Sequence, residues 1–245
     1  MRQILPSPAE ITAEDAYGEP RPTMEGRPWV ALDMIASVDG AIAVEGRSGG
    51  LGGPADKAVF RALRGAADVV LVGAGTARAE GYGPVRADDA TRARRRARGQ
   101  APVARLALVT ARLDLDPEAR MFTEAEEPPV VITTVAAAAG ADAALAGRAD
   151  LVAVGDDEVD LALGMAALHE RGASLVLVEG GPTLNGHLVA ADLVDEWCLS
   201  IAPVLVSGES GRAAHGPEPT EPVAMQLHRL LEADGYLFAT YRRAR

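Results

Sequence analysis

The chain of 245 residues is poor in the residue types that build several common kinds of functional site. Its single cysteine, Cys198, excludes an internal disulfide and a cysteine-built zinc site, so we expect a reducing, cytoplasmic location. The four histidines show no metal-ligand spacing such as HExxH. The sequence therefore predicts no metal centre.

Positive charge and aromatic residues are also scarce. A net charge of −11 and an aromatic content of 4% argue against a nucleic-acid binder, which needs a basic face and stacking side chains. No apolar run is long enough to cross a bilayer, and the N-terminus does not have the pattern of a secretory signal. We expect a globular protein that binds a small molecule, and neither nucleic acid nor a membrane.

Two parts of the chain differ in pattern. Residues 1–27 are rich in Pro, Glu and Gly and lack a clear period, which is typical of an N-terminal arm. Residues 28–245 contain no linker and are predicted to form one domain. In this part, apolar β-branched runs alternate with helical patterns, which predicts an α/β fold with a mostly parallel sheet flanked by helices.

The element boundaries follow from periodicity and from glycine and proline. The predicted strands are Trp29–Ala36, Ala41–Val44, Asp68–Val72, Val103–Val109, Pro129–Thr133, Leu151–Val154, Ser174–Val178 and Val194–Ala202. Helices are predicted after Pro54, after Gly75, over Val135–Leu145 and Leu161–Glu170, and from about Thr183. A flexible loop is expected at Val204–His215, and Asp234-Gly235 predicts a C-terminal antiparallel hairpin.

Two strand-to-helix turns contain paired glycines. They are Glu179-Gly180-Gly181-Pro182 and Gly73-Ala74-Gly75-Thr76. Glycine lets a ligand approach the backbone closely, and the free N–H groups of the following helix favour an anion. A packing turn is the alternative, and the strict GxGxxG fingerprint is absent because Arg78 stands at the third glycine position. Two such turns favour a ligand that carries phosphates.

Polar residues in and after the first strand have two interpretations. Asp33 interrupts an apolar strand, so it faces either a cleft or solvent. Ser37 and Asp39 follow the strand's carboxyl end, where α/β sheets bind ligands, although Asp-Gly also favours a simple turn. Asp56 is predicted to cap a helix, and the arginine run 92–98 to form a solvated surface rather than a phosphate site.

The ordered combination of several motifs resembles a known family. These motifs are Ala36-Ser37-Val38-Asp39-Gly40, Gly73–Thr76, Glu179–Leu184, Leu193-Val194-Asp195-Glu196 and Ala202-Pro203. They are similar to the RibD C-terminal family, the pyrimidine reductases of riboflavin biosynthesis, from about Pro28 to the C-terminus. The resemblance implies a three-layer fold like that of dihydrofolate reductase. The zinc deaminase half of the bifunctional relatives, with its H-x-E and C-x-x-C ligands, is absent from this sequence.

The resemblance implies NADPH-dependent hydride transfer to C1′ of a ribosylaminopyrimidine 5′-phosphate, and a homodimer. The substrate would be 5-amino-6-(5-phosphoribosylamino)uracil or its diamino precursor. Acid–base or hydroxyl-binding roles would fall to Glu179, Asp39 and Glu80, and substrate contacts to Asp33, Ser37 and Arg86, the last at the phosphate. The implied cofactor residues are Gly73, Gly75, Thr76, Thr110, Thr133, Gly180, Gly181, Pro182, Thr183 and Leu184.

Two departures from the family pattern affect the substrate more than the cofactor. Asp33 stands where the family commonly has lysine, and Gly52-Gly53 replace a serine/threonine pair. One alternative is therefore a pteridine reductase, in which Asp33 binds the protonatable pterin edge. Another is a nucleotide-binding protein that has lost catalysis.

Overall fold

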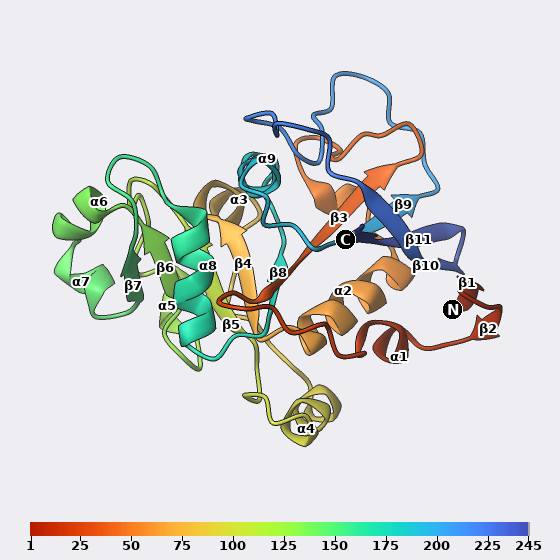
Figure 1. The fold of residues 1–245 in the computed structure, drawn as a ribbon, viewed down its shortest axis with the longest axis horizontal. Helices are drawn as coiled ribbons and strands as arrows, with labels where there is room; N and C mark the ends of the chain where they lie inside the picture. Colours follow the sequence, from red (N-terminus) through yellow and green to blue (C-terminus); the bar gives the residue numbers. More distant parts are fainter. Residues whose placement is uncertain (245) are drawn as a thin grey trace. The chain divides into compact units, whose positions relative to one another are not determined.

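A computed structural model describes residues 1–244, which fall into two compact units. Unit 1 comprises Met1–Arg21, Trp29–Ala66 and Val178–Arg245, and unit 2 comprises Pro22–Pro28 and Ala67–Leu177. Figure 1 shows the elements of both units along the chain. Unit 2 is thus a nearly continuous segment, whereas unit 1 is assembled from three segments that are distant in sequence.

Unit 1 is built on a largely antiparallel set of strands. The strands are β1 (Arg2–Leu5), β2 (Ala9–Glu10), β3 (Trp29–Ser37), β9 (Glu196–Ala202), β10 (Met225–Ala233) and β11 (Tyr236–Arg243), in the order β2-β1-β10-β11-β9-β3. Among the described strand pairs of unit 1, the β3–β9 pair is parallel, with Asp33 opposite Cys198, and the others are antiparallel. The helices are α1 (Ala13–Tyr17), α2 (Pro54–Ala66) and α9 (Pro182–Ala190), with a 3₁₀ turn at Ser48–Gly50.

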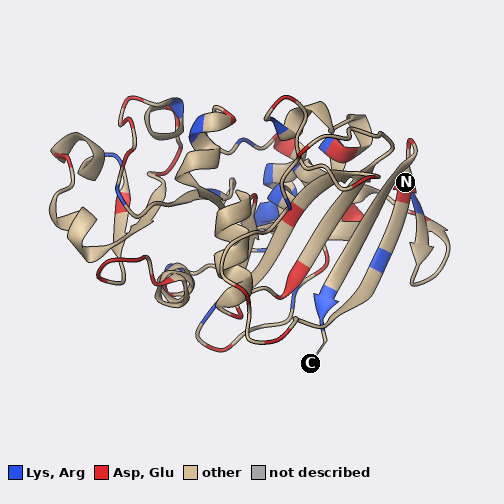
Figure 2. Ribbon diagram, turned by 90° about the horizontal axis from the view of Figure 1, so that it is seen from above, with Lys and Arg blue, Asp and Glu red and all other residues tan. Residues whose placement is uncertain are grey.

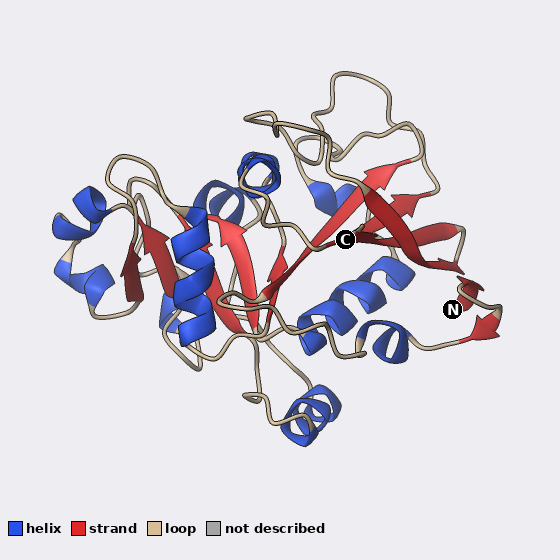
Figure 3. Cartoon of the chain, in the orientation of Figure 1, coloured by secondary structure: helices blue, strands red, loops and turns tan. Residues whose placement is uncertain are grey.

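Unit 2 is an α/β unit with parallel strands (Figure 3). Its strands are β4 (Val69–Gly73), β5 (Arg105–Val109), β6 (Val130–Thr133), β7 (Asp150–Ala153) and β8 (Leu175–Val178), in the order β8-β4-β5-β6-β7. Its helices are α3 (Ala74–Ala79), α4 (Asp89–Ala97), α5 (Arg120–Thr123), α6 (Val135–Ala139), α7 (Ala143–Ala146) and α8 (Leu161–Glu170). Val70, Leu71 and Val72 are fully buried, as expected for a parallel strand covered on both faces.

The predicted fold class is confirmed: an α/β fold with a mostly parallel central sheet, flanking helices and antiparallel strands at one edge. The C-terminal hairpin is present as β10 and β11, joined at Asp234-Gly235. The prediction of a short strand at Ala41–Val44 is wrong, because the structure has an isolated bridge from Val44 to Arg47 there instead of a strand. The single helix predicted over Val135–Leu145 is also wrong. It is split because α6 ends at Gly140 and Asp142 caps a second helix, α7.

Residues 1–21 of the N-terminal arm are an integral part of unit 1. β1 pairs antiparallel with β10, and Tyr17 of α1 is 1% exposed. Arg21 donates two hydrogen bonds, of 3.0 and 2.7 Å, to the fully buried carboxylate of Glu196. The boundary predicted after residue 27 stays a prediction, but residues 1–21 pack as regular structure rather than as a loose lead-in.

The arginine run forms a surface helix, as predicted, with one exception. Arg95 of α4 is 1% exposed and donates to the carbonyl oxygens of Ala101 and Ala67. Arg92 pairs with Glu126 at the surface. Basic and acidic residues are interspersed along the ribbon (Figure 2). Among residues 1–244, no helix has the length and apolar character that a membrane span requires.

Candidate active site

In unit 2, the predicted cofactor residues lie at the carboxyl edge of parallel strands. β4 ends at Gly73, which pairs in register with Val109 at the end of β5. The N–H of Thr110 donates to the carbonyl of Ile132 in β6, one residue before Thr133. Parallel strands end at the same edge of a sheet, so Gly73, Thr110 and Thr133 share that edge, where α/β proteins bind ligands.

This edge has the properties that a phosphate-bearing ligand needs. Gly73 caps α3 without a side-chain hydrogen bond, so the backbone N–H groups of the first turn are not covered by a capping side chain. A Cβ added at Gly75 would have open space around it, and Thr76 follows in the same turn. Thr133 Oγ1 is a buried polar atom without a hydrogen-bond partner in the structure. The edge therefore fits a nucleotide cofactor.

In unit 1, the second glycine turn leads into α9. Gly180 has a φ of +87°, a region that favours glycine, and its peptide bond to Gly181 is cis. Gly181 caps α9, and Pro182 is the first helical residue, where a missing N–H is harmless. Thr183 Oγ1 lies 3.3 Å from His215 Nε2, and Leu184 is buried. The turn has the backbone geometry expected of an anion-binding helix start.

Glu179 is held rigidly beside this turn. Arg64 of α2 donates from Nε and Nη2 to its two carboxylate oxygens, at 2.6 Å each. The Glu179 side chain is 3% exposed, and the Arg64 guanidinium stacks 4.2 Å above the Phe60 ring. A bidentate pair in a buried setting fixes the plane of the carboxylate. Glu179 is therefore a pre-oriented hydrogen-bond acceptor.

Asp33 lies in an acidic environment on β3. Burial raises its pKa well above the ordinary value, and the negative charges of Glu179 and Asp56 raise it further, while Arg64 offsets part of the effect. Burial likewise raises the pKa of Asp56, whose side chain hydrogen-bonds Ser200 of β9. Asp33 therefore retains its proton toward neutral pH more readily than an exposed aspartate. Since Asp56 bonds a neighbouring strand, the predicted role as a simple helix cap is incomplete.

The glycine pair at residues 52 and 53 has a steric explanation. A Cβ on Gly53 would lie 2.8 Å from Tyr236 Oη, and a Cβ on Gly52 would lie 3.0 Å from Asp56 Oδ2. Tyr236 Oη donates to the Leu51 carbonyl at 2.8 Å, so its position is fixed. Tyr236 and Asp56 thus fill the space that side chains at residues 52 and 53 would need.

Asp39 contacts the segment that follows β9. Its carboxylate accepts hydrogen bonds from Ser37 Oγ at 2.5 Å and from Ser207 N at 2.7 Å. The hydrogen bond from Ser37, together with those from the Ser207 and Val206 N–H groups, lowers the pKa of Asp39 to about 2. Asp39 therefore carries no proton to donate at neutral pH, which weighs against a role as general acid. Its catalytic assignment stays a prediction.

Glu80 and Arg86 lie in unit 2, after α3. Glu80 is exposed and ends that helix. Arg86 pairs with Glu124 at 2.7 Å, with side chains 68% and 40% exposed. Glu124 would compete with a substrate phosphate for Arg86. The substrate role of Arg86 stays a prediction, as does the role of Glu80.

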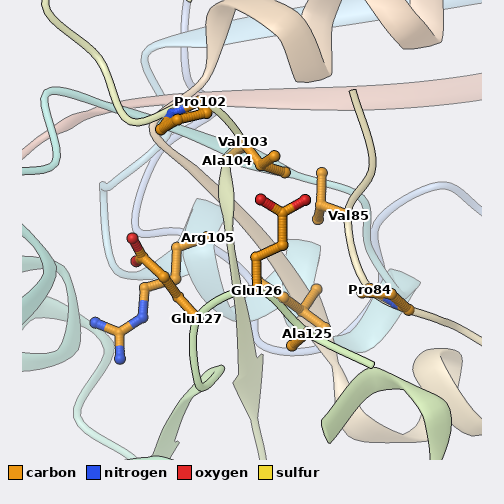
Figure 4. A pocket seen from close by; sticks show the side chains of 10 residues that line it. Pro84, Val85, Pro102, Val103, Ala104, Arg105, Ala125, Glu126 and Glu127 are labelled. Carbon is orange, nitrogen blue, oxygen red and sulfur yellow. The ribbon is translucent and has the colours of Figure 1, made fainter. Parts of the chain in front are cut away.

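A small pocket in unit 2 lies away from the predicted cofactor residues (Figure 4). It is lined by Pro84, Val85, Pro102, Val103, Ala104, Arg105, Leu106, Ala125, Glu126 and Glu127. Arg105 is the first residue of β5, whereas Thr110 follows its last. The pocket therefore lies at the opposite end of the strand from the carboxyl edge. Its Glu126 is already paired with Arg92.

Comparison with known proteins gives the family. Residues 28–235 match the model of the RibD C-terminal domain. The chain belongs to the RibD C-terminal domain family. It is 32% identical over 201 residues to a 2,5-diamino-6-ribosylamino-4(3H)-pyrimidinone 5′-phosphate reductase of Methanothermobacter thermautotrophicus, covering 81% of this chain and 88% of the relative. The reductase of the same name from Aquifex aeolicus is 30% identical over 213 residues, covering 84% and 91%.

A solved structure agrees in fold with this chain. It is a pyrimidine reductase-like protein from Corynebacterium diphtheriae, with a TM-score of 0.79 and 26% identity, covering 96% of this chain and all of that one. The predicted family is thus confirmed. Membership of a reductase family implies a nicotinamide cofactor as the source of hydride.

Sequence reasoning missed several residues of the candidate site. Arg64, Ser200 and Tyr236 have no local pattern that marks them, because their partners are distant in sequence. Arg64 and Glu179 are separated by 115 positions, and Tyr236 and Leu51 by 185. The one available signal was Gly52-Gly53, whose lack of side chains indicated that something else occupies their place.

Proposed function

We propose that this protein is an NADPH-dependent reductase of a ribosylaminopyrimidine 5′-phosphate in riboflavin biosynthesis. The observation that carries the proposal is the family match over residues 28–235. It is supported by relatives that are named as reductases of such a compound and that this chain matches over most of their length. Hydride would pass from the nicotinamide C4 to C1′ of the opened ribose. We further expect a cytoplasmic location and a homodimer. Light scattering on the purified protein would test the homodimer.

The cofactor residues are proposed from the two glycine turns. In unit 2, Gly73, Gly75 and Thr76 would bind phosphate through the start of α3, with Thr110 and Thr133 toward the adenosine half. In unit 1, residues 180–184 would bind through the start of α9. The open space at Gly75 and the positive φ of Gly180 support these roles. The bound cofactor would supply the hydride, and the protein would align donor and acceptor.

Acidic residues of unit 1 are proposed to orient the substrate and to supply a proton. Glu179, fixed by Arg64, would accept hydrogen bonds from ribose hydroxyl groups and orient the sugar. Asp33, whose pKa is raised by burial, would present a proton or a hydrogen-bond donor to the substrate at neutral pH. Ser37, at the end of the same strand, is a further proposed substrate contact. Arg86 of unit 2 is the proposed ligand of the substrate phosphate.

A direct experiment is to titrate the purified protein with NADPH and then to add candidate substrates. We expect NADPH fluorescence to change on binding, and absorbance at the reduced nicotinamide band to fall with the ribosylaminopyrimidine phosphate. Gly181→Val should abolish NADPH binding, because a branched side chain would stand at the start of α9. Circular dichroism and the melting temperature check that this variant is folded. NADPH binding by folded Gly181→Val with normal affinity would refute the placement of the site.

A pteridine reductase is the second candidate, and the surroundings of Asp33 favour it. A carboxyl group among Glu179 and Asp56 suits a substrate edge that is rich in hydrogen-bond donors or protonatable. NADPH consumption with dihydrofolate but not with the ribosylaminopyrimidine phosphate would select this function. Tight NADPH binding without turnover of either compound would select a nucleotide-binding protein that has lost catalysis.

A further inference from the structure

The segment 204–216, here called the strap, connects β9 toward β10 and has no regular secondary structure (Figure 1). It is nevertheless anchored at its beginning. Asp39 accepts hydrogen bonds from the N–H of Ser207 at 2.7 Å and of Val206 at 3.2 Å. The N–H of Val38 donates to the Val204 carbonyl at 3.1 Å, and the N–H of Ile42 donates to Ser210 Oγ at 2.9 Å. The turn after β3 therefore holds the first half of the strap.

The end of the strap is anchored on α9. The N–H of His215 donates to the Pro182 carbonyl at 3.1 Å, and Asn185 Nδ2 donates to the Ala213 carbonyl at 2.7 Å. The strap backbone touches the helix so closely that a Cβ on Gly186 would lie 2.1 Å from the His215 carbonyl oxygen. Only glycine fits at residue 186 while the strap is seated.

The contacts of this second anchor fall on the helix that begins at the Gly180–Thr183 turn. Pro182 and Asn185 belong to the first turns of α9, and Asn185 is fully buried. The Asn185 Nδ2 atom is 3.9 Å from the Cβ position of Gly180. Movement of the strap would therefore remove hydrogen bonds from Pro182, which belongs to the turn, and from Asn185, whose backbone N–H donates to the Gly181 carbonyl at 3.0 Å.

We propose that the strap holds the Gly180–Thr183 turn in the cofactor-binding position, and that Asp39 is a positioning residue acting through the strap. The inference rests on the proposed function, because it takes this turn as part of the cofactor site. It assigns to Asp39 a task other than proton transfer. The Asp39 carboxylate accepts hydrogen bonds from two backbone N–H groups of the strap. The side-chain amide of an asparagine at this position would retain an oxygen that can accept such a hydrogen bond.

The first test compares two substitutions of Asp39. Asp39→Ala removes the anchor, so trypsin should cleave after the exposed Arg212 about tenfold faster, and the Kd for NADPH should rise about tenfold. Asp39→Asn should restore both values to within about threefold of the wild type, since it can still accept a hydrogen bond. Mass spectrometry identifies the cleavage site. A general acid or base would behave differently: both variants would lose kcat equally, with unchanged cleavage and Kd.

The second test lifts the strap from its other end. Gly186→Ala places a methyl group against His215 while favouring the helix intrinsically, so the chain should fold and the strap should move. Gly211→Ala is the matched control, because the atom nearest to a Cβ on Gly211, Ile42 Cδ1, would be 3.8 Å away, which is ordinary contact. We expect faster cleavage and weaker NADPH binding for Gly186→Ala and neither for Gly211→Ala.

The double variant Asp39→Ala with Gly186→Ala decides whether the two ends act through one strap. Its increase in Kd should be close to that of the more affected single variant, because a released strap cannot be released again. Independent, multiplying effects would overturn the proposal, as would unchanged cleavage after Arg212 in both single variants. If the wild type fails to bind NADPH, the proposed function fails, whereas the cleavage measurements still report on the strap.

Discussion

The two units place their charged residues differently. In unit 2, ion pairs lie at the surface, as with Asp150, which pairs with Arg105 and Arg171 and is 32% exposed. Unit 2 also buries one arginine, Arg95, but unit 1 has a buried ion-pair network, in which the Glu196 side chain is fully buried between Arg21, itself 3% exposed, and Arg242. Buried charges require partners that are precisely placed, whereas surface charges tolerate rearrangement.

The difference extends to the candidate site. Unit 2 offers backbone N–H groups, glycine turns and threonines at the carboxyl edge of parallel strands, which suit a cofactor that brings its own charge. Unit 1 offers acidic side chains, namely Glu179, which Arg64 holds in place, and Asp33, whose pKa is raised by burial; they suit a substrate that must be oriented and protonated. Under the proposed function, unit 2 would bind mainly through its backbone, and unit 1 would act mainly through acidic side chains.

The largest effect that we predict is on stability in unit 1. Glu196→Gln leaves two arginines around a buried neutral amide, which should lower the free energy of unfolding by about 3–5 kcal/mol. Asp150→Asn in unit 2 should cost less than about 1 kcal/mol, since its partners remain hydrated. Urea unfolding of both variants at neutral pH measures the difference. Equal losses in the free energy of unfolding would show that the buried pair of unit 1 is no more important for stability than the surface pair of unit 2.

A smaller effect is expected at the cofactor edge of unit 2. Gly75→Ala adds a methyl group to the open space above α3, so NADPH affinity should fall about tenfold, or about 1.4 kcal/mol. Stability should rise slightly, because alanine favours a helix over glycine. Gly83→Ala, whose nearest neighbour is Arg120 Nη2 at 3.7 Å, is the control and should leave affinity unchanged. Affinity that stays constant in Gly75→Ala would remove this edge from the cofactor site.

The predictability of the units from sequence follows the same division. In unit 2, strands such as β4 and helix α8 were predicted from local patterns, because a strand buried on both faces is continuously apolar and a helix has its own period. The resemblance to the family, and not these patterns, assigned Thr110 and Thr133 to the cofactor; in the structure they lie with Gly73 at the ends of those strands. Even here, the break between α6 and α7 was missed, because the cap at Asp142 outweighed the helical propensity of alanine.

In unit 1, the strands were predicted but their side-chain partners were not. The pair of Arg21 and Glu196 spans 175 positions, and that of Asp39 and Ser207 spans 168. Such contacts have no local signal, because they depend on how β3, β9 and the strap come together in three dimensions. The strap was therefore predicted as a flexible loop, although both of its ends are anchored.

The last prediction concerns Asp33, whose ionisation is opposed by burial and then by the neighbouring carboxylates of unit 1. Because the folded-state pKa is raised, ionising Asp33 destabilises the native chain once the pH exceeds the unfolded value of about 3.9. Asp33→Asn should therefore raise the melting temperature at neutral pH by about 2–4 °C, the change that about 1 kcal/mol produces in a chain of this size. The gain should shrink as the pH falls and vanish below about pH 4, where aspartate is protonated in both states. Calorimetry from pH 3.5 to 8 measures the trend. A gain in melting temperature that is independent of pH would show that folding does not raise the pKa of Asp33. Turnover should fall at the same time if Asp33 supplies the proton, so a variant that is both more stable and fully active would separate this carboxyl from the chemistry of unit 1.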